Sequence, residues 1–148
     1  MLKLGEQCII LEMKSKSKNE ALEELSTTVH SQCTVVDPTV LLDVLREREQ
    51  VGSTGVGNGV AIPHAKVPGL DQLLLCFGRS VKGISFDAID NRPVHLFVQI
   101  LSPMGMADEY LRTLARISRL FKIESNRKFL LQARTKQEIL DFFNAPEI

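Results

Sequence analysis

The chain has 148 residues, of which 44% are hydrophobic and 24% charged, a composition typical of one compact globular domain rather than of a disordered chain. Lys plus Arg and Asp plus Glu both number 18, so the formal net charge is zero, and no overall field favours nucleic acid or an anionic membrane. The N-terminal segment lacks the apolar run of a signal peptide, and no stretch approaches the roughly 20 apolar residues of a membrane helix, so the sequence predicts a cytoplasmic protein that binds neither nucleic acid nor membrane.

The first third of the chain predicts a strand and two helices. Gln7–Met13 is a short apolar run that is typical of a strand. Ser17 opens a capping box, SKNE, which is followed by apolar residues at helical spacing. Asp37 and Pro38 indicate a second helix start, with Asp as the N-cap and Pro at the first helical position. The charged run RERE ends this helix and is by default a solvated helix end.

The next stretch, Gly52–Gly59, reads GSTGVGNG and has four glycines in eight positions. Such a sequence favours neither a helix nor a regular strand, so it predicts a loop with special backbone angles. The loop runs through Val60–Ile62 into Pro63 and His64.

The remaining elements predict an α/β fold. Gln72–Phe77 and Val94–Leu101 are apolar and β-prone, as in buried strands, and Asp90-Asn91 between them predicts a turn. Three helices are expected to close the chain, over Asp108–Phe121, Asn126–Ala133 and the segment after the capping box at Thr135. With no repeat or linker, residues 1–148 predict one domain in which helices cover both faces of a mixed sheet.

The three cysteines, Cys8, Cys33 and Cys76, are widely spaced and form no CxxC pair. They therefore predict reduced, buried thiols, with neither a disulfide framework nor a metal site.

His64 is the main candidate for chemistry. Glycines allow consecutive backbone N–H groups to turn toward an anion without Cβ clashes, and the hydroxyls of Ser53 and Thr54 add donors. A histidine with a pKa of about 6.5 is largely neutral near pH 7, hence a nucleophile that needs no separate base. Phosphoryl transfer requires little beyond positioning and charge stabilisation, which such a loop and one arginine can supply. The predicted phosphate-binding residues of the loop are Ser53, Thr54, Gly55, Gly57 and Asn58.

The spacing alone leaves a structural loop with an incidental histidine about as plausible as a phosphate site. The loop is not a Walker loop, because no Gly-Lys-Ser/Thr follows it. It is not a dinucleotide fingerprint either, since that motif opens a helix directly after a strand.

The strings REQVGSTGVGNGVAIPHAK and FDAIDNRPV resemble the enzyme IIA domain of the fructose–mannitol class of the bacterial phosphotransferase system. Within that class the chain is most similar to the stand-alone nitrogen-regulatory enzyme IIA, and the similarity covers nearly the whole chain. The resemblance implies a single type-2 enzyme IIA domain with a three-layer α/β/α fold, built on a five-stranded mixed sheet with helices on both faces. It implies no cofactor and no metal.

The resemblance also implies roles for single residues. The histidine after the proline, here His64, accepts phosphate from the histidine phosphocarrier protein, on Nε2 in the family. The helix-terminal arginine that compensates phosphate charge matches Arg48. A second active-site histidine of the family, in a string like HLxTL, is replaced in the string YLRTL by Tyr110. Tyr110 can donate a hydrogen bond to a phosphoryl oxygen but cannot carry a proton near pH 7. The alternative role for its ring is packing at the helix start.

The other two histidines have structural interpretations. His30 lies late in an amphipathic helix, where a surface or capping role is expected. His95 lies within the strand VHLFVQI, where a packed and hydrogen-bonded histidine is expected.

Three functions are compatible with the sequence. The first is a regulatory phosphoryl carrier whose charge, changed by phosphorylation of His64, alters which partner proteins bind. The second is a sugar-permease-linked enzyme IIA that passes the phosphoryl group to a IIB domain. The third is a binding protein that has lost phosphotransfer, which the Tyr110 replacement suggests and the retention of His64, Arg48 and the glycine loop argues against. The absence of a fused IIB, IIC or phosphocarrier segment and the string FDAIDNRPV favour the first.

Overall fold

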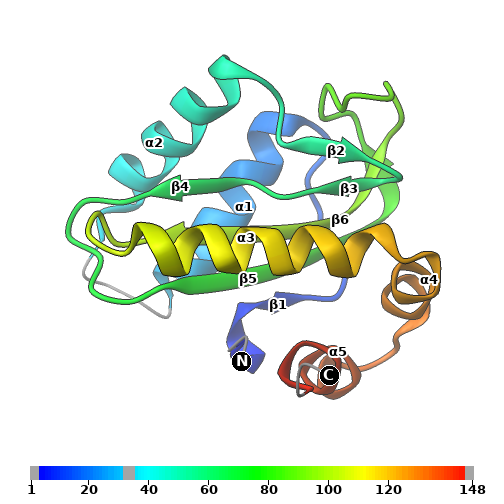
Figure 1. Ribbon diagram of the computed structural model, residues 1–148. Helices are drawn as coiled ribbons and strands as arrows, with labels where there is room; N and C mark the ends of the chain where they lie inside the picture. The colour runs from blue at the N-terminus through cyan, green and yellow to red at the C-terminus, as the bar shows by residue number, and fades with distance from the viewer. Residues whose placement is uncertain (1–3, 32–35, 146–148) are drawn as a thin grey trace.

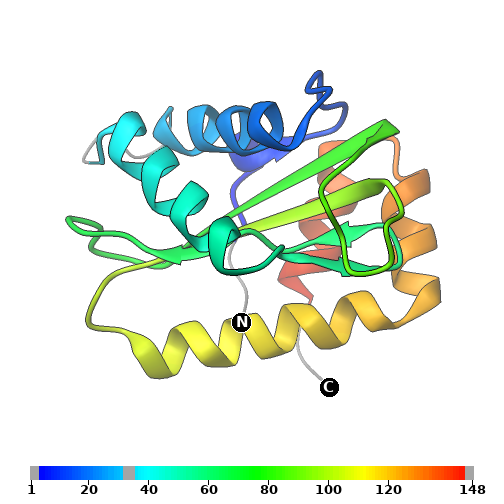
Figure 2. The same cartoon turned by 90° about the horizontal axis from the view of Figure 1, so that it is seen from above.

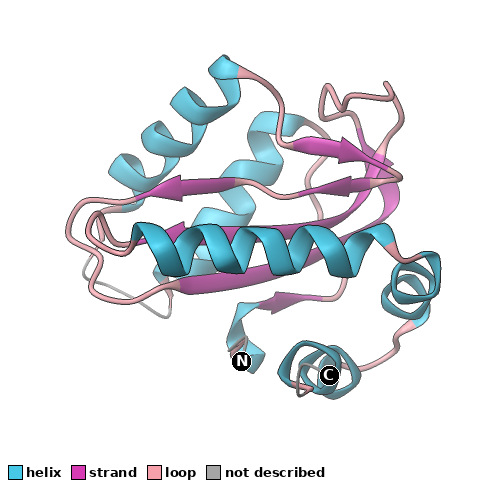
Figure 3. Cartoon of the chain, in the orientation of Figure 1, coloured by secondary structure: helices cyan, strands magenta, loops and turns pink. Residues whose placement is uncertain are grey.

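The computed structural model describes residues 4–31 and 36–145. It has a central mixed sheet between layers of helices (Figures 1 and 3). Its elements are η1 (Glu6–Cys8), β1 (Ile9–Ile10), α1 (Lys18–His30), α2 (Pro38–Val51), β2 (Gly55–Gly57), β3 (Val60–Ala61), β4 (His64–Lys66), β5 (Leu74–Ile84), β6 (Val94–Ser102), α3 (Ala107–Lys122), α4 (Glu124–Gln132) and α5 (Lys136–Asn144).

Three helix starts are fixed by the predicted caps. The Ser17 hydroxyl accepts from the Glu20 N–H at 3.2 Å at the start of α1, and the Asp37 carboxylate accepts from the Thr39 N–H at 2.8 Å at the start of α2. Thr135 caps α5 in the same way. Each cap satisfies a backbone N–H that has no partner within its helix, and all three predictions are confirmed.

The sheet runs in the order β1-β5-β6-β3-β2, and β4 also pairs with β6. Strands β3 and β4 both run parallel to β6 and keep the same offset along it, since Val60 lies opposite Leu96 and His64 opposite Ile100. They are two parts of one strand, interrupted at Pro63, which has no N–H to donate. Counted this way the sheet has five strands side by side, as the predicted three-layer α/β/α fold requires.

Helices α1 and α2 cover one face of the sheet and α3 covers the other (Figure 2). Helix α5 lies on the α3 side, where Phe143 packs on Phe77 of β5 at 5.6 Å between ring centroids and on Phe121 of α3 at 6.2 Å. On the opposite face, Leu22 and Leu25 of α1 are buried. Burial of these apolar side chains from both layers is the main stabilising contribution to the fold.

Three sequence predictions for strands need correction. The strand predicted over Gln7–Met13 contains only Ile9–Ile10, because the chain before it forms a 3₁₀ turn in which the Cys8 N–H bonds to the Gly5 carbonyl. The strand predicted over Gln72–Phe77 begins at Leu74 and continues to Ile84, since pairing with β6 outweighs its polar and glycine residues. The glycine-rich loop contains a short strand, β2, paired antiparallel to β3.

The thiols of Cys8 and Cys76 are free and buried, as predicted, and burial raises the pKa of both. Cys33 lies outside the described residues.

Candidate functional site

His64 begins β4 and its side chain is half-buried. Its Nδ1 lies 2.6 Å from the carbonyl oxygen of Ile62. A carbonyl can only accept, so Nδ1 carries the proton and donates it. In the neutral ring Nε2 then keeps its lone pair and is the nucleophilic atom.

The surroundings favour the neutral form of this ring. Burial lowers the pKa of His64, and the positive charge of Arg48 lowers it further. The hydrogen bond to Ile62 and the negative charge of Glu49 act in the opposite direction. The net effect is a pKa below its usual value, which favours the neutral ring at neutral pH.

Arg48 lies in the last turn of α2, where its Nη1 donates to the Gly52 carbonyl at 2.8 Å. Its charge acts on His64 and also on Tyr110, whose pKa is raised by burial and held back by Arg48. A guanidinium has five N–H donors, so the bond to Gly52 leaves donors for an anion beside the imidazole.

Tyr110 lies in the first turn of α3 and is 8% exposed. Its ring centroid is 6.1 Å from that of His64, with the rings tilted by 55°. The structure therefore brings together His64, Arg48 and Tyr110 from β4, α2 and α3.

Ser53, Thr54 and Gly55 follow the end of α2, and both hydroxyls and the N–H groups of Thr54 and Gly55 are used within the protein. The Ser53 hydroxyl donates to the Phe86 carbonyl at 2.8 Å and accepts from the Gly55 N–H at 3.0 Å. The Thr54 N–H donates to Glu49 Oε1 at 3.0 Å, and the Thr54 hydroxyl donates to Glu49 Oε2. Phosphate binding by these residues stays a prediction.

Gly57 is the last residue of β2 and Asn58 begins the turn to β3, with positive φ angles of 94° and 57°. The Asn58 N–H donates to the carboxylate of Asp90 at 3.1 Å. Gly57 pairs with Val60, four residues before His64, which corresponds to about 13 Å along a strand. The structure does not place these two residues beside His64, and their phosphate role also stays a prediction.

The two sequence strings that carry the family resemblance pack against each other. A Cβ added to Gly55 would lie 2.8 Å from the Cα and Cβ of Ala88, and the Gly55 carbonyl accepts from the Ile89 N–H at 3.1 Å. The predicted turn at Asp90-Asn91 is present, with the Asn91 N–H bonded to the Ala88 carbonyl at 2.9 Å. The segment FDAIDNRPV thus packs against the glycine loop and hydrogen-bonds to it.

Glu49 was missed by the sequence interpretation, which treated the RERE run as solvated apart from Arg48. The Glu49 side chain is 6% exposed and pairs with Lys18 of α1 at 3.0 Å. A signal was available, because Glu49 lies in the last turn of one helix and Lys18 begins another. Both charges oppose the dipole of their own helix, and such charges indicate a partner elsewhere.

The other two histidines have the structural roles expected of them. His30 Nδ1 lies 3.1 Å from the Val36 carbonyl, and His95 Nδ1 lies 2.9 Å from the Ser80 carbonyl. Neither ring is part of the cluster formed by His64, Arg48 and Tyr110.

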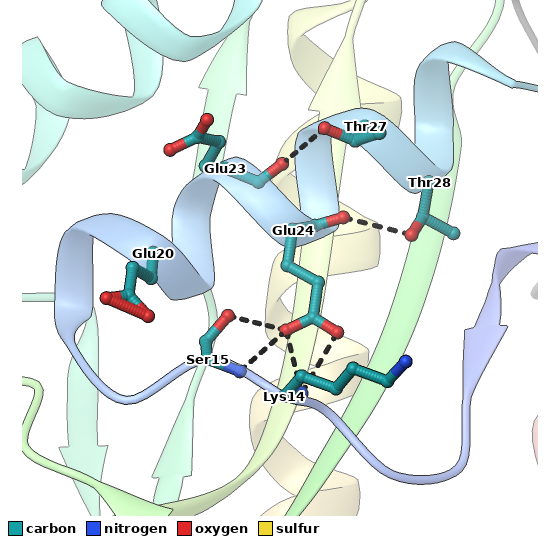
Figure 4. Close-up of a pocket in the computed structure, with 7 residues that line it drawn as sticks. All are labelled: Lys14, Ser15, Glu20, Glu23, Glu24, Thr27 and Thr28. Atoms are coloured by element: carbon teal, nitrogen blue, oxygen red, sulfur yellow. Dashed lines mark hydrogen bonds between the residues drawn. The ribbon is translucent and has the colours of Figure 1, made fainter.

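A pocket on the outer side of α1 is separate from this cluster (Figure 4). The carboxylate of Glu24 points to the backbone of Lys14 and Ser15, where Oε1 accepts both N–H groups and the Ser15 hydroxyl. This carboxylate therefore closes the turn before α1 and is not part of the candidate site.

The family model described as "Phosphoenolpyruvate-dependent sugar phosphotransferase system, EIIA 2" matches residues 3–145. The chain is 36% identical to a nitrogen regulatory protein of Bradyrhizobium diazoefficiens over 95% of this chain and 91% of the relative. It is 38% identical to the fructose-specific EIIA component of Haloferax volcanii over 91% of this chain and 88% of the relative. It is 33% identical to the fructose-specific EIIABC component of Bacillus subtilis over 95% of this chain, but spans only 22% of that protein.

Among solved structures, the nitrogen regulatory protein IIA-Ntr of Neisseria meningitidis superposes with a TM-score of 0.89 at 30% identity, over 95% of this chain and 96% of the other. Within residues 4–31 and 36–145, no helix is long and apolar enough to cross a membrane.

Proposed function

The chain belongs to the EIIA 2 family of the phosphoenolpyruvate-dependent sugar phosphotransferase system, and we propose that it is a regulatory phosphoryl carrier that accepts a phosphoryl group on His64. The observation that carries this proposal is the hydrogen bond from His64 Nδ1 to the Ile62 carbonyl, which leaves Nε2 as the reactive nitrogen. The proposed donor is the histidine phosphocarrier protein, which transfers the group from its own phosphohistidine.

The proposed reaction needs no base. The Nε2 lone pair attacks phosphorus, a new N–P bond forms, and the bond from phosphorus to the donor's ring nitrogen breaks as that ring regains its lone pair. The His64 ring becomes cationic, because Nδ1 keeps its proton and continues to donate it to the Ile62 carbonyl. Arg48 stabilises the charge on the phosphoryl oxygens through N–H donors, and Tyr110 is the proposed second donor.

The regulatory role is supported by the match to the nitrogen regulatory proteins over most of both chains. The phosphoryl group brings about −1.5 to −2 charges to the sheet edge, partly offset by the positive charge of the phosphorylated ring, and we propose that this net gain of negative charge decides which partner proteins bind. A single type-2 domain over residues 1–148 is part of the proposal, and the cytoplasmic location stays a prediction.

The second candidate is a permease-linked enzyme IIA that passes the group to a IIB domain. The fructose-specific relative, which aligns over most of its own length, favours it.

Labelling with radioactive phosphoenolpyruvate, enzyme I and the phosphocarrier protein tests the proposal. The parent protein, His30→Ala and His95→Ala should be labelled, whereas His64→Ala should not. Substantial label on His64→Ala would reject the assignment. Rapid loss of label to an added fructose-type IIB domain would replace the regulatory role with the permease-linked one.

A further inference from the structure

An ion pair followed by a series of hydrogen bonds connects the first residue of α1 to the imidazole of His64. Lys18 Nζ lies 3.0 Å from Glu49 Oε1, and the carboxylate of Glu49 accepts both the N–H and the hydroxyl of Thr54. The Thr54 carbonyl accepts from the Ile62 N–H at 2.9 Å. The Ile62 carbonyl accepts from His64 Nδ1 at 2.6 Å.

The charged end of this series is well enclosed. The side chains of Glu49 and Lys18 are 6% and 23% exposed, and Thr54 is 2% exposed. Lys18 Nζ also lies 4.9 Å from the centroid of the Phe86 ring. Lys18 Nζ lies farther from the exposed carboxylate of Asp87, at 3.8 Å, than from Glu49. A largely buried carboxylate without its cation is costly, so the position of Glu49 depends on Lys18.

The peptide group of Ile62 lies between Thr54 and His64. Its N–H donates to the Thr54 carbonyl, and its own carbonyl accepts from His64 Nδ1. A movement of Thr54 therefore displaces the carbonyl that accepts the Nδ1 proton. Glu49 is bonded to Thr54 through two donors, which fixes both the backbone and the side chain of that residue.

We propose that the Lys18–Glu49 ion pair is a positioning element for phosphoryl transfer, because it holds Thr54, and through it the Ile62 carbonyl, where that carbonyl selects the Nδ1–H tautomer of His64. Neither residue touches the phosphoryl group. This inference rests on the proposed function of His64 and extends it to a residue of α1, on the other side of the sheet from Tyr110.

Loss of the ion pair should have two linked effects. With the Ile62 carbonyl displaced, the Nδ1–H tautomer loses its acceptor and the share of Nε2–H molecules, which cannot attack phosphorus, rises. In the molecules that keep the reactive tautomer, Nε2 is less well oriented toward phosphorus. A displacement of a reacting group by about 1 Å can slow a reaction by up to about 100-fold. We expect transfer to slow by about tenfold or more.

The experiment compares the parent with Glu49→Gln, which removes the charge at nearly constant shape, and with Lys18→Met. Lys18→Arg keeps the charge and should restore most of the rate. The matched control is Glu124→Gln, which breaks the exposed Glu124–Lys128 pair of α4 at 3.1 Å. Two quantities are measured: the ¹⁵N chemical shifts of the His64 ring, which report its tautomer, and the initial rate of labelling by the phosphocarrier protein.

In Glu49→Gln and Lys18→Met the fraction of Nδ1–H tautomer and the rate of phosphoryl transfer should both fall. In Glu124→Gln neither should change. A slower rate with the parent tautomer would show a merely structural role and overturn the inference, as would no change in either quantity. If Glu49→Gln does not fold, Thr54→Val, which removes only the hydroxyl bond, must show the same tautomer shift. Failure of the parent protein to be labelled would instead reject the proposed function.

Discussion

At the scale of single residues, the chemistry of His64 depends on which ring nitrogen holds the proton. The Ile62 carbonyl binds Nδ1, and burial together with Arg48 keeps the ring neutral. The proposed reactivity therefore needs one backbone acceptor and a nearby positive charge, without a catalytic base.

Replacement of Arg48 by Ala should slow labelling of His64 by about 10- to 100-fold, the equivalent of one hydrogen bond to a charged group at about 1.5–3 kcal/mol. It should also raise the pKa of His64, because the positive charge that disfavours the imidazolium is removed. Labelling rates and an NMR titration of the ring measure both effects.

The matched control for this change is Arg46→Ala, since Arg46 lies on the same helix but donates to Asn19 at 2.7 Å. Equal labelling rates for Arg48→Ala and the parent would show that Arg48 has no role in transfer.

Tyr110 stands where the sequence resemblance implies a second histidine. If its hydroxyl donates to a phosphoryl oxygen in the transition state, Tyr110→Phe should slow transfer by about one to two orders of magnitude, from the loss of a bond worth about 1.5–3 kcal/mol. Stopped-flow or quench-flow transfer measurements on the Phe and His variants decide the matter. An unchanged rate in Tyr110→Phe would leave the ring as packing only, and a faster Tyr110→His would show that the phenol is the weaker donor.

At the scale of the elements, the glycine loop and the turn at 85–91 stabilise each other. The absence of a Cβ at Gly55 allows the close approach of Ala88, and Ser53 bridges the loop to the Phe86 carbonyl. The position of Thr54, between these contacts, is thereby fixed relative to the end of α2.

Gly55→Ala should destabilise the protein by about 1–3 kcal/mol, the usual cost of an added methyl group in a packed site. Urea unfolding measures this change. Gly52→Ala is the matched control, because an added Cβ there meets nothing within 4 Å and should change stability by less than about 0.5 kcal/mol. Equal stability of the two variants would contradict the packing role of Gly55.

The sequence predicted elements whose signals are local. The caps at Ser17, Asp37 and Thr135 and the apolar runs of β5 and β6 depend on neighbouring residues only, and the motif around His64 predicted its family. Strand β2 was not predicted because glycines disfavour strands and only pairing with β3 orders it. The Lys18–Glu49 pair was missed for a similar reason, since its two residues are 31 positions apart and meet only when α1 and α2 pack.

At the scale of the whole molecule, His64 lies on the strand where the two helical layers can both reach it. Arg48 comes from α2 on one face of the sheet and Tyr110 from α3 on the other (Figure 2). A central strand has a neighbouring strand on each side. Among the described strands β4 pairs with β6 alone, so its other side is an open edge of the sheet. The fold thus places the proposed nucleophile between a cation from one helical layer and a hydroxyl group from the other.

The measurement that tests this account most directly is heteronuclear NMR of the ¹⁵N-histidine-labelled protein after phosphorylation by the phosphocarrier protein. The account predicts a ³¹P coupling to Nε2 of His64, with Nδ1 still protonated and bonded to the Ile62 carbonyl. Phosphorus bonded to Nδ1 of His64, or to another residue, would contradict it.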